Sequence, residues 1–561
     1  MTAPPSFGIV EGMAARARLQ TVDRWSDGFT FAPSSRPANA PACEVDVLFL
    51  NVVCGSFAGM DALGVGFLRS VLEGSGYKTR ELVIKQSALD DGSWRSLLPQ
   101  PLPRLVGFSV NYQNEDAAEQ LAGELRRAAG RPKGGADSSA GPPARPFLVA
   151  GGPQVNLRGE DFLVRSPSFD GACLGEGEPL ILELIRRIDD GRPLDATIPG
   201  LLWRRDGAVV ANPRAQNVDL DSLPFPIYDQ VGPGAPYPLV TSRACPYDCV
   251  FCMVKVIYGN RKWRHRTAES VVAELREVSR RGIREIAIQD DCFNTSVPRA
   301  KEIFRGILEA KLDLDIIFPN GIRADLLDDE LVALMKRAGT VRAPFGVENL
   351  DPETKHLLGK SLKFEKLQRA AELFKRHGLR SEAFMIIGLP ETDYASVMRS
   401  LSELKRAGVE VARWYIAYNY EGTAMDKWVR EHGRPVREPE GPKNPWSARP
   451  PMNFDTAAFP AEERLRAFFK CNAESNNFLV LGYEENQPAL RALVFALARI
   501  ARYSPASFPA FVRYALHAVV DFNGAVFNEP RRNKVTLFDM LQKFRFQSRA
   551  SVRSVEREAC A

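Results

Sequence analysis

The segment TSRACPYDCVFCMVK, residues 241–255, holds the most informative residues of this chain. It places Cys245, Cys249 and Cys252 in a CxxxCxxC pattern. With 9 cysteines among 561 residues, three cysteines at these offsets by chance are improbable. Thiolates are soft ligands that bind zinc, copper(I) or iron-sulfur clusters. The spacing therefore predicts a metal or cluster site, and buried unreactive thiols are the alternative.

The pattern lacks the fourth ligand that a closed site needs. Zinc in structural sites has four protein ligands, often from two close pairs, and a four-iron cluster is normally held by four cysteines. No second pair follows here, because Cys292 and His265 each stand alone in the sequence. Three thiolates on a four-iron cluster would leave one iron open to a substrate or cofactor.

The residues that follow alternate between strand-like and helix-like runs. Helical runs such as AESVVAELREVSRRG and FEKLQRAAELFKRHG end in glycine, as helices often do. Six strands at this spacing predict a partial (β/α) barrel, whose site lies at the carboxyl ends of the strands. The predicted strands begin with LVTSRACP and continue over 285–291, 315–323, 342–349, 380–390 and 411–420.

The residues before the cysteine segment predict a separate α/β domain. Apolar runs of strand length over 45–53, 104–110 and 146–153 alternate with amphipathic helical runs. This alternation predicts a doubly wound, Rossmann-like parallel sheet, although no GxGxxG motif follows the first run. Asp206 and Gly207 form the turn of a predicted β-hairpin, and a proline-rich linker follows.

Composition limits the classes of protein that the chain fits. The net charge is +5 without a long basic run, so nucleic-acid binding is not predicted. We recognise no signal peptide or membrane span, and the sparse cysteines fit a reducing compartment, so we expect a cytoplasmic protein. The expected segments are a flexible N-terminus (1–40), a ligand-binding domain (41–219), a linker (220–237), the barrel (238–435) and a mostly helical C-terminal region (436–561).

The cysteine segment resembles the signature of the radical S-adenosylmethionine (SAM) superfamily. The shared features are CxxxCxxC after a first barrel strand and an aromatic residue, Phe251, before the third cysteine. In that family three cysteines hold a [4Fe-4S] cluster, SAM chelates the fourth iron, and an electron from the cluster cleaves SAM to a 5'-deoxyadenosyl radical. The resemblance covers residues 236–435. It implies a cluster on Cys245, Cys249 and Cys252 and an external electron donor such as flavodoxin or ferredoxin.

The same resemblance implies which residues contact SAM. They follow the predicted barrel strands, in part within the motifs IQDDCF, GVEN and IIGLPE. A solvated acidic turn is the alternative for the two aspartates, and a structural salt bridge is the alternative for Arg323. The implied SAM contacts are Phe251, Asp290, Asp291, Arg323, Glu348, Ile387 and Gly388.

The first domain resembles the cobalamin-binding domain that precedes some radical SAM domains. Its matching features are Ser109, the Gly151-Gly152 pair and the acidic turn LGEGE. All five histidines follow this domain, so it has no imidazole to offer to cobalt. The glutamates of LGEGE could instead form the solvated start of a helix. Cys54 could instead be a small buried thiol with no contact to cobalamin. The implied cobalamin contacts are Cys54, Ser109, Asn111, Gly151, Gly152, Pro153, Gly175 and Glu176.

Together these resemblances imply a cobalamin-dependent radical SAM methyltransferase. It would move a methyl group from SAM, by way of methylcobalamin, to an unactivated carbon of a small-molecule, natural-product or peptide substrate. One alternative is an oxidative cyclase or ring-rearranging enzyme with the same cofactors, and another is a non-catalytic cobalamin-binding or light-sensing module. The C-terminal helices are expected to cap the barrel mouth, with contact to a carrier protein or a membrane as alternatives.

Overall fold

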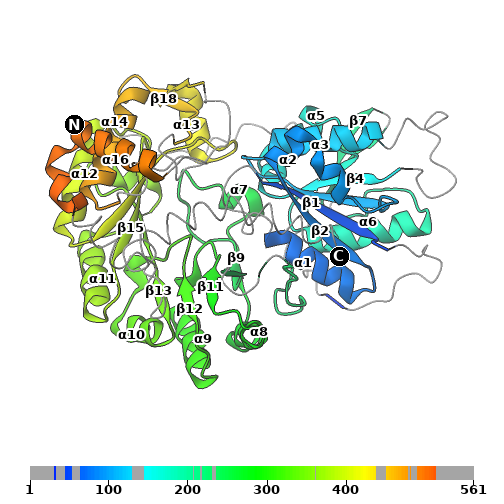
Figure 1. Ribbon diagram of the computed structural model, residues 1–561, viewed down its shortest axis with the longest axis horizontal. Helices are drawn as coiled ribbons and strands as arrows, with labels where there is room; N and C mark the ends of the chain where they lie inside the picture. Colours follow the sequence, from blue (N-terminus) through cyan, green and yellow to red (C-terminus); the bar gives the residue numbers. More distant parts are fainter. Residues whose placement is uncertain are drawn as a thin grey trace, which may run out of the picture.

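A computed structural model describes most of the chain as two bodies that lie side by side. In Figure 1 the first body, blue to cyan, contains β1 to β7, and the second, green to orange, contains β8 and the elements after it. The predicted flexible segment 1–40 lies outside the described residues except for 31–32, as do Cys54 and Asp206. The described residues are 31–32, 44–53, 63–128, 145–205, 207–214, 218–229, 231, 236–360, 362–437, 450–477, 481 and 489–512.

The first body is built on one sheet with the strand order β2-β1-β3-β4-β5-β6-β7. Neighbouring strands from β2 to β5 are parallel, whereas β5, β6 and β7 are antiparallel. The predicted parallel α/β sheet is therefore confirmed, and β6 and β7 form the predicted hairpin. The strands are β1 (Val47–Val53), β2 (Thr79–Lys85), β3 (Leu105–Ser109), β4 (Phe147–Gly151), β5 (Gly171–Cys173), β6 (Leu201–Arg205) and β7 (Ala208–Ala211).

Strand β2 has no counterpart among the predicted strands. Its sequence is TRELVIK, and it lies at the edge of the sheet with β1 as its neighbour. Ile84 is its buried residue, while the others are exposed or half-buried. A strand at a sheet edge need not be a continuous apolar run, so a search for buried runs does not find it.

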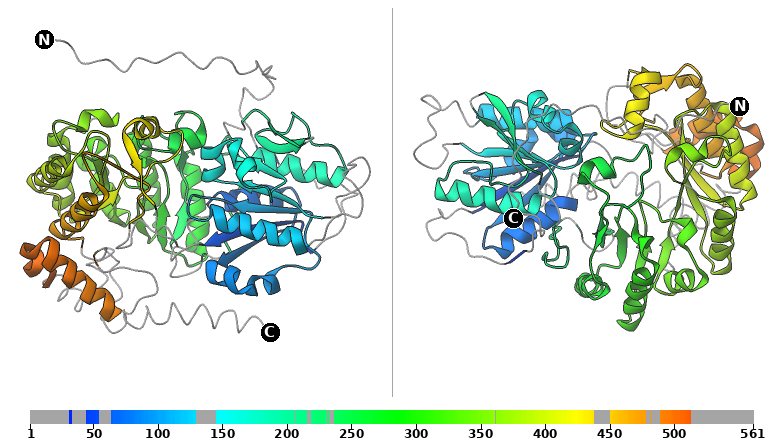
Figure 2. Two further views of the ribbon diagram at one scale, coloured as in Figure 1. Left: turned by 90° about the horizontal axis from the view of Figure 1, so that it is seen from above. Right: turned by 180° about the vertical axis from the view of Figure 1, so that it is seen from behind.

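Helices cover both faces of this sheet, which is why β1 is apolar almost throughout. Phe49 of β1 packs in a cluster with residues of α1 (Leu63–Gly74) and α6 (Gly177–Asp190). Leu50, the next residue, points to the other face and packs with residues of α3 (Glu115–Ala128). Figure 2 shows the helices on either side of the sheet.

The second body contains parallel strands that follow one another in chain order. They form two sheets, β13-β12-β11-β8 and β14-β15-β16, joined by a bridge between Ile322 and Phe345. The predicted strand over 342–349 is two short strands, because Pro344 between them has no N–H to continue the ladder. The strands are β8 (Tyr237–Leu239), β11 (Glu285–Ile288), β12 (Asp315–Ile317), β13 (Thr340–Arg342), β14 (Phe345–Glu348), β15 (Glu382–Ile387) and β16 (Val411–Ile416).

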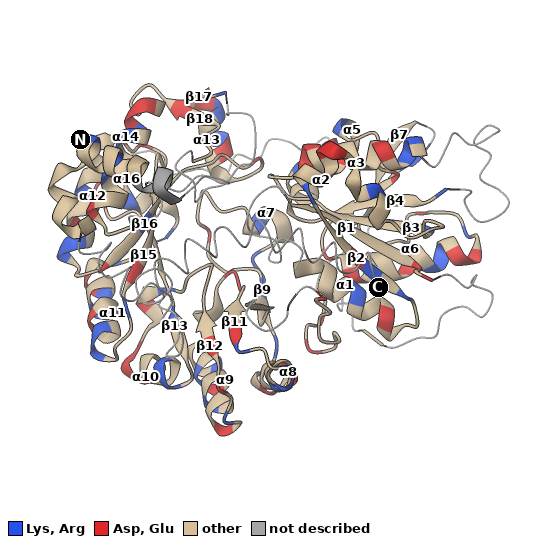
Figure 3. Ribbon diagram, viewed as in Figure 1, with Lys and Arg blue, Asp and Glu red and all other residues tan. Residues whose placement is uncertain are grey.

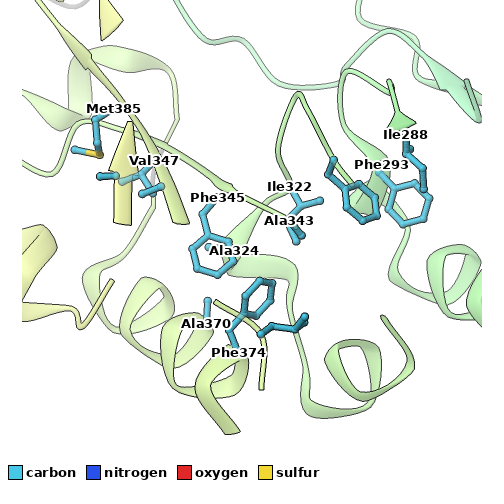
Figure 4. Close-up of a cluster of buried hydrophobic side chains, with 14 of the residues drawn as sticks. Ile288, Phe293, Ile322, Ala324, Ala343, Phe345, Val347, Ala370, Phe374 and Met385 are labelled. Atoms are coloured by element: carbon cyan, nitrogen blue, oxygen red, sulfur yellow. The ribbon is translucent and has the colours of Figure 1, made fainter. Parts of the chain in front are cut away.

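The helices between these strands lie outside the sheets and share one core with them. In Figure 4 Phe345 of β14 packs against Phe374 of α11, and their ring centroids are 4.7 Å apart. Charged residues of both signs lie on the outer helices (Figure 3). The helices are α8 (Ala268–Arg280), α9 (Val297–Glu309), α10 (Asp329–Arg337), α11 (Phe364–Arg376) and α12 (Tyr394–Arg406).

The C-terminal region is helical in part, but it shares the core of the barrel. Phe468 of α14 (Ala461–Glu474) belongs to the same apolar cluster as the barrel strands. The indole of Trp414 on β16 donates to Ser475 Oγ at 3.0 Å, directly after this helix. The further elements are α13 (Ala424–His432), the antiparallel pair β17 (Gly433–Pro435) and β18 (Phe454–Thr456), and α16 (Ala489–Tyr503). Within the described ranges, no helix has the length and apolar character needed to cross a bilayer.

Candidate functional site

Three free thiols lie on the loop between β9 (Ser242–Arg243) and the short helix α7 (Val254–Tyr258). They belong to Cys245, Cys249 and Cys252, and each residue is partly exposed. Burial raises the pKa of Cys249 to about 11 and that of Cys252 to about 12, and both thiols also respond to the charges of neighbouring cysteines. The three sulfur atoms therefore lie close enough for the charge of one thiolate to affect the pKa of the others.

This set of ligand atoms fits a [4Fe-4S] cluster. Cysteine thiolates are the usual ligands of such clusters. Each thiolate binds a different iron atom, so the three sulfur atoms need not meet at one point. Among the residues that the structure describes, no three His, Cys, Asp or Glu side chains converge on a position for a single metal ion.

Backbone hydrogen bonds fix the cysteine loop to two other parts of the barrel. Val250 N donates to Leu358 O, after β14, at 3.1 Å. Met425 N, after β16, donates to Val250 O at 2.9 Å. Phe251 packs beside a small apolar cluster to which Leu358 and Met425 belong. Its predicted contact with SAM stays a prediction.

A fourth cysteine lies beside this group, which the sequence alone does not reveal. Cys292 follows β11 and is 4% exposed. A side-chain hydrogen bond links its sulfur to that of Cys245, and this bond raises the pKa of Cys245 and lowers that of Cys292. The one signal in the sequence is the place of Cys292 directly after two aspartates at the end of a predicted strand.

The carboxylate of Asp290 accepts hydrogen bonds from the segment that leads into the cysteine loop. Its carboxylate accepts hydrogen bonds from Thr241 N at 2.6 Å and Thr241 Oγ1 at 2.5 Å. It also accepts from Ser242 N at 3.0 Å and Ser242 Oγ at 2.6 Å. The residue is 2% exposed, and both of its oxygens have protein donors. Asp290 therefore supports the loop, and its predicted contact with SAM stays a prediction.

Asp291 holds the residue that precedes the first cysteine. Its carboxylate accepts from Ala244 N at 3.0 Å. Ala244 has a φ of 65°, which is strained for a residue with a side chain, so this hydrogen bond stabilises an unusual turn. Burial, followed by the charge of Asp290, raises the pKa of Asp291 to about 7. Its contact with SAM stays a prediction.

Arg323 forms the structural salt bridge that was the alternative to its SAM contact. Its Nε and Nη2 donate to the two carboxylate oxygens of Asp325 at 2.9 and 2.7 Å. The guanidinium also lies over the ring of Tyr247, in the cysteine loop, with its Cζ 3.8 Å from the centroid. Arg323 therefore supports the cysteine loop, and its predicted contact with the SAM carboxylate stays a prediction.

Glu348 and Gly388 lie at the carboxyl ends of adjacent strands with unusual backbone angles. Glu348 ends β14 with a φ of 72°, and its carboxylate is 3.3 Å from Lys360 Nζ. Such strained residues are concentrated at functional sites. Gly388 follows Ile387 with a φ of 86°, and a β-carbon there would lie 2.7 Å from the guanidinium of buried Arg464. The predicted SAM contacts of Glu348, Ile387 and Gly388 are compatible with these positions and stay predictions.

In the first body, small and polar residues form a row near the carboxyl ends of the strands. Ser109 on β3 lies opposite Gly151 on β4, and a β-carbon on Gly151 would have Cys173 as its neighbour at 3.7 Å. Asn51 on β1 continues this row in the same register. In sheets with the order β2-β1-β3-β4-β5, ligands bind outside these carboxyl ends. The row therefore suits a ligand that comes close to the backbone.

Asn51 is a candidate contact that the sequence reasoning missed. It is 1% exposed, yet neither atom of its side-chain amide has a hydrogen-bond partner in the described structure. Buried amides are nearly always hydrogen-bonded, so an amide without a partner in the described residues marks a candidate ligand contact. Its signal was present in the sequence, because it is the polar residue of the otherwise apolar strand VLFLNVV.

Other predicted cobalamin contacts have local structural roles. A β-carbon on Gly152, whose φ is 110°, would lie 2.6 Å from Val110 O, so glycine is required there by the chain itself. Asn111 N donates to Asn114 Oδ1 at 2.8 Å, and Asn114 N donates to Asn111 Oδ1 at 3.2 Å, which forms the turn before α3. Pro153 is the first residue of α4 (Pro153–Arg158). Their contacts with cobalamin stay predictions.

Glu176 joins the two bodies. It is 7% exposed, and its carboxylate lies 3.0 Å from Arg243 Nη1 and 2.6 Å from Arg264 Nη2. Burial alone would raise the pKa of Glu176, but the two arginines lower it. Its predicted contact with cobalamin stays a prediction. The neighbouring Gly175, with a φ of 93°, donates its N–H to Asn156 Oδ1 at 2.7 Å.

The carboxyl ends of the strands in the two bodies face each other. Tyr112, after β3, has its ring centroid 5.4 Å from that of Tyr418 and 5.6 Å from that of Tyr420, both after β16. The charge of Cys252 contributes to the raised pKa of Tyr420, after burial and the other two tyrosines, so the rings lie near the cysteine loop. In Figure 1, α7 lies between the two bodies on this side.

Comparison with known proteins identifies the second body. A family model described as the radical SAM superfamily matches residues 239–417. An uncharacterized methyltransferase of Pyrococcus horikoshii is 31% identical over 290 residues, which are 50% of this chain and 62% of that protein. An anaerobic magnesium-protoporphyrin IX monomethyl ester cyclase of Synechocystis is 25% identical over 271 residues, which are 46% of this chain and 53% of the cyclase. The chain thus spans between half and two thirds of the length of these relatives.

A solved structure extends the likeness to the first body. The radical SAM methyltransferase TsrM of Kitasatospora setae, with cobalamin and a [4Fe-4S] cluster bound, matches with a TM-score of 0.59 at 17% identity. The match covers 83% of this chain and 90% of TsrM, and at this identity it establishes the shared fold. Residues 239–417 therefore match the radical SAM superfamily, and the resemblance of the chain to the cobalamin-dependent radical SAM enzymes is confirmed.

Proposed function

We propose that this protein is a cobalamin-dependent radical SAM methyltransferase. It would transfer the methyl group to an unactivated carbon of a small-molecule, natural-product or peptide substrate. The observation that carries the proposal is the placement of three free thiols on a loop beside the edge where the two bodies meet. Two cofactors at facing sites can act on one substrate atom, and holding reacting groups together is a large part of catalysis.

The residues available for each cofactor differ in chemistry. Cys245, Cys249 and Cys252 would hold the [4Fe-4S] cluster through their thiolates. The backbone near Ser109 and Gly151, with the unpaired amide of Asn51, would hold cobalamin. The expected SAM contacts are Phe251, Asp290, Asp291, Arg323, Glu348, Ile387 and Gly388. When bound, these cofactors supply one-electron chemistry and a transferable methyl group.

The protein itself would orient these groups and exclude water. Asp291 fixes the peptide before Cys245 through Ala244 N. The rings of Tyr112, Tyr418 and Tyr420 pack together where the two sites meet and shield that region from solvent. An external flavodoxin or ferredoxin would deliver the electron.

The test is anaerobic reconstitution with iron, sulfide and hydroxocobalamin, followed by reaction with SAM that carries a deuterated methyl group. We expect 5'-deoxyadenosine together with a product that carries the label. The candidate substrates should include small aromatic and peptide compounds. Formation of 5'-deoxyadenosine with an unlabelled, oxidised product would contradict methyl transfer.

A second candidate function is oxidative cyclisation or ring rearrangement with the same cofactors. It is supported by the similarity to the cyclase of Synechocystis. The labelled SAM separates the two reactions, since a cyclase forms a new ring without incorporating the label. A non-catalytic cobalamin module is a poorer fit, because it has no use for the cysteine loop.

A further inference from the structure

A buried group of four charged side chains crosses the boundary between the two bodies. Glu176 and Glu178 come from the first body, and Arg243 and Arg264 come from the second. Arg243 Nη2 is 2.6 Å from Glu178 Oε1, and its Nη1 is 3.0 Å from Glu176 Oε1. The side chains are between 3% and 14% exposed. Two negative and two positive charges thus neutralise each other within the interface.

Glu176 is the centre of this group. Arg264 Nη2 donates to its Oε1 at 2.6 Å, and Arg264 Nη1 donates to its Oε2 at 3.0 Å. Val218 N donates to the same Oε2 at 2.9 Å. Arg243 on β9 lies opposite Arg264 on the antiparallel strand β10 (Arg264–His265), so both side chains reach the carboxylate from one side. The carboxylate therefore has donors at both oxygens.

The group connects the surroundings of the two proposed cofactor sites. On one side, Arg243 is separated from Cys245 by Ala244 alone, whose backbone is already strained. On the other side, Glu176 follows β5, one of the strands that end at the proposed cobalamin edge. In Figure 1, β9 lies on the side of the barrel that faces the first body.

We propose that Glu176 is a positioning residue, which sets the separation of the cysteine loop from the cobalamin edge through Arg243 and Arg264. The inference rests on the proposed function and adds a determinant of its geometry. A buried ion pair is in itself weak support for stability, because apolar residues of similar volume often serve as well. Fixing two cofactors to a single separation is a task that a directional, multiply hydrogen-bonded group performs better than apolar packing.

The test compares Glu176→Gln with the wild-type holoenzyme. Glutamine keeps the size of the side chain but removes the charge that holds both arginines. Two measurements report on position: the dipolar coupling between the EPR signals of cob(II)alamin and the reduced cluster, and the ratio of methylated product to 5'-deoxyadenosine. We expect a changed coupling and a ratio lower by about 10²-fold, the size of loss that a displacement of 1 Å can cause. SAM cleavage should persist, because it requires the barrel alone.

Glu274→Gln is the matched control. Glu274 is 1% exposed, pairs with Arg266 and accepts from the Tyr237 hydroxyl at 2.6 Å, all within the barrel. The Glu274→Gln variant should have a lower melting temperature. Its EPR dipolar coupling and its ratio of methylated product to 5'-deoxyadenosine should be those of the wild type. Equal effects in both variants, or an unchanged coupling in Glu176→Gln, would overturn the proposal.

Two further results keep the test decisive. If Glu176→Gln does not fold, Arg264→Gln replaces it, because that variant keeps the pair between Glu176 and Arg243, and we expect a smaller change of the same kind. If the wild-type enzyme forms no methylated product, the proposed function fails, but the EPR coupling still tests whether Glu176 sets the separation.

Discussion

Replacing Asn51 by leucine tests whether the row of small and polar residues on β1, β3 and β4 binds a ligand. Both atoms of the Asn51 amide are buried and have no hydrogen-bond partner among the described residues, and burying an unpaired amide costs about 1–3 kcal/mol. Leucine is similar in size and has no polar atom to satisfy. The cofactor-free variant should therefore be more stable than the wild type by about 1–3 kcal/mol. Urea unfolding followed by circular dichroism measures this difference.

The same variant should bind cobalamin more weakly. If the amide bonds to cobalamin, its loss should raise Kd by about 5–150-fold, which corresponds to about 1–3 kcal/mol. Absorbance titration with hydroxocobalamin gives this value. A variant that is less stable and binds cobalamin as tightly as the wild type would refute the reasoning.

Asn114→Leu is the matched control for this experiment. Asn114 is also 1% exposed, but its Nδ2 donates to Val52 O at 2.9 Å and to Ser109 O at 3.1 Å. Its replacement removes both of these hydrogen bonds, so it should destabilise the protein by about 1–3 kcal/mol. If Asn51→Leu raises the free energy of unfolding and Asn114→Leu lowers it, Asn51 is a ligand contact and Asn114 is a structural residue.

Three further predictions follow from the barrel. Cys249→Ala should lose cluster iron and sulfide while cobalamin binding persists, as chemical analysis of the reconstituted protein would show; loss of both cofactors would argue against two separate sites. Gly388→Ala should lower stability by at least about 2 kcal/mol more than Gly378→Ala, because both glycines have a positive φ but only Gly388 adjoins the Arg464 guanidinium, and similar melting temperatures would contradict this. Burial would raise the pKa of Glu382, but Arg413 and Arg342 hold it at about 2, below the ordinary value of about 4.3. The wild type should thus lose up to about 3 kcal/mol as the pH falls from about 5 to 2, whereas Glu382→Gln should lose less in urea titrations over that range.

The cysteine loop and the order of strands could be predicted from the sequence, because both depend on local patterns. A CxxxCxxC spacing and alternating apolar runs lie within short windows of the chain. The split between β13 and β14 was also signalled locally, by Pro344, yet an apolar run on both sides of it suggested one strand. Strand β2 was not predicted, because a strand at a sheet edge needs few buried residues and so lacks an apolar run.

The roles of the charged residues could not be predicted, because they depend on partners far away in the chain. Glu176 pairs with Arg243 and Arg264, which lie 67 and 88 residues further along the chain. Asp290 and Asp291 are adjacent in sequence, but they bind different parts of the chain before Cys245. Cys292 looked isolated for the same reason. Asn51, by contrast, carried a local signal that was overlooked, since a polar residue in a fully buried strand needs an explanation.

The packing of α14 against β16 has a consequence for how the chain can be divided. The ring of Trp414 is 1% exposed because this helix covers it, and Arg464 of the same helix lies under Gly388. A fragment that stopped at residue 435 would uncover a tryptophan and lose the support of the turn after β15. The strands of the second body therefore do not form a unit that can be exchanged alone, and recombination between relatives should succeed only when these strands and the residues up to 477 are inherited together.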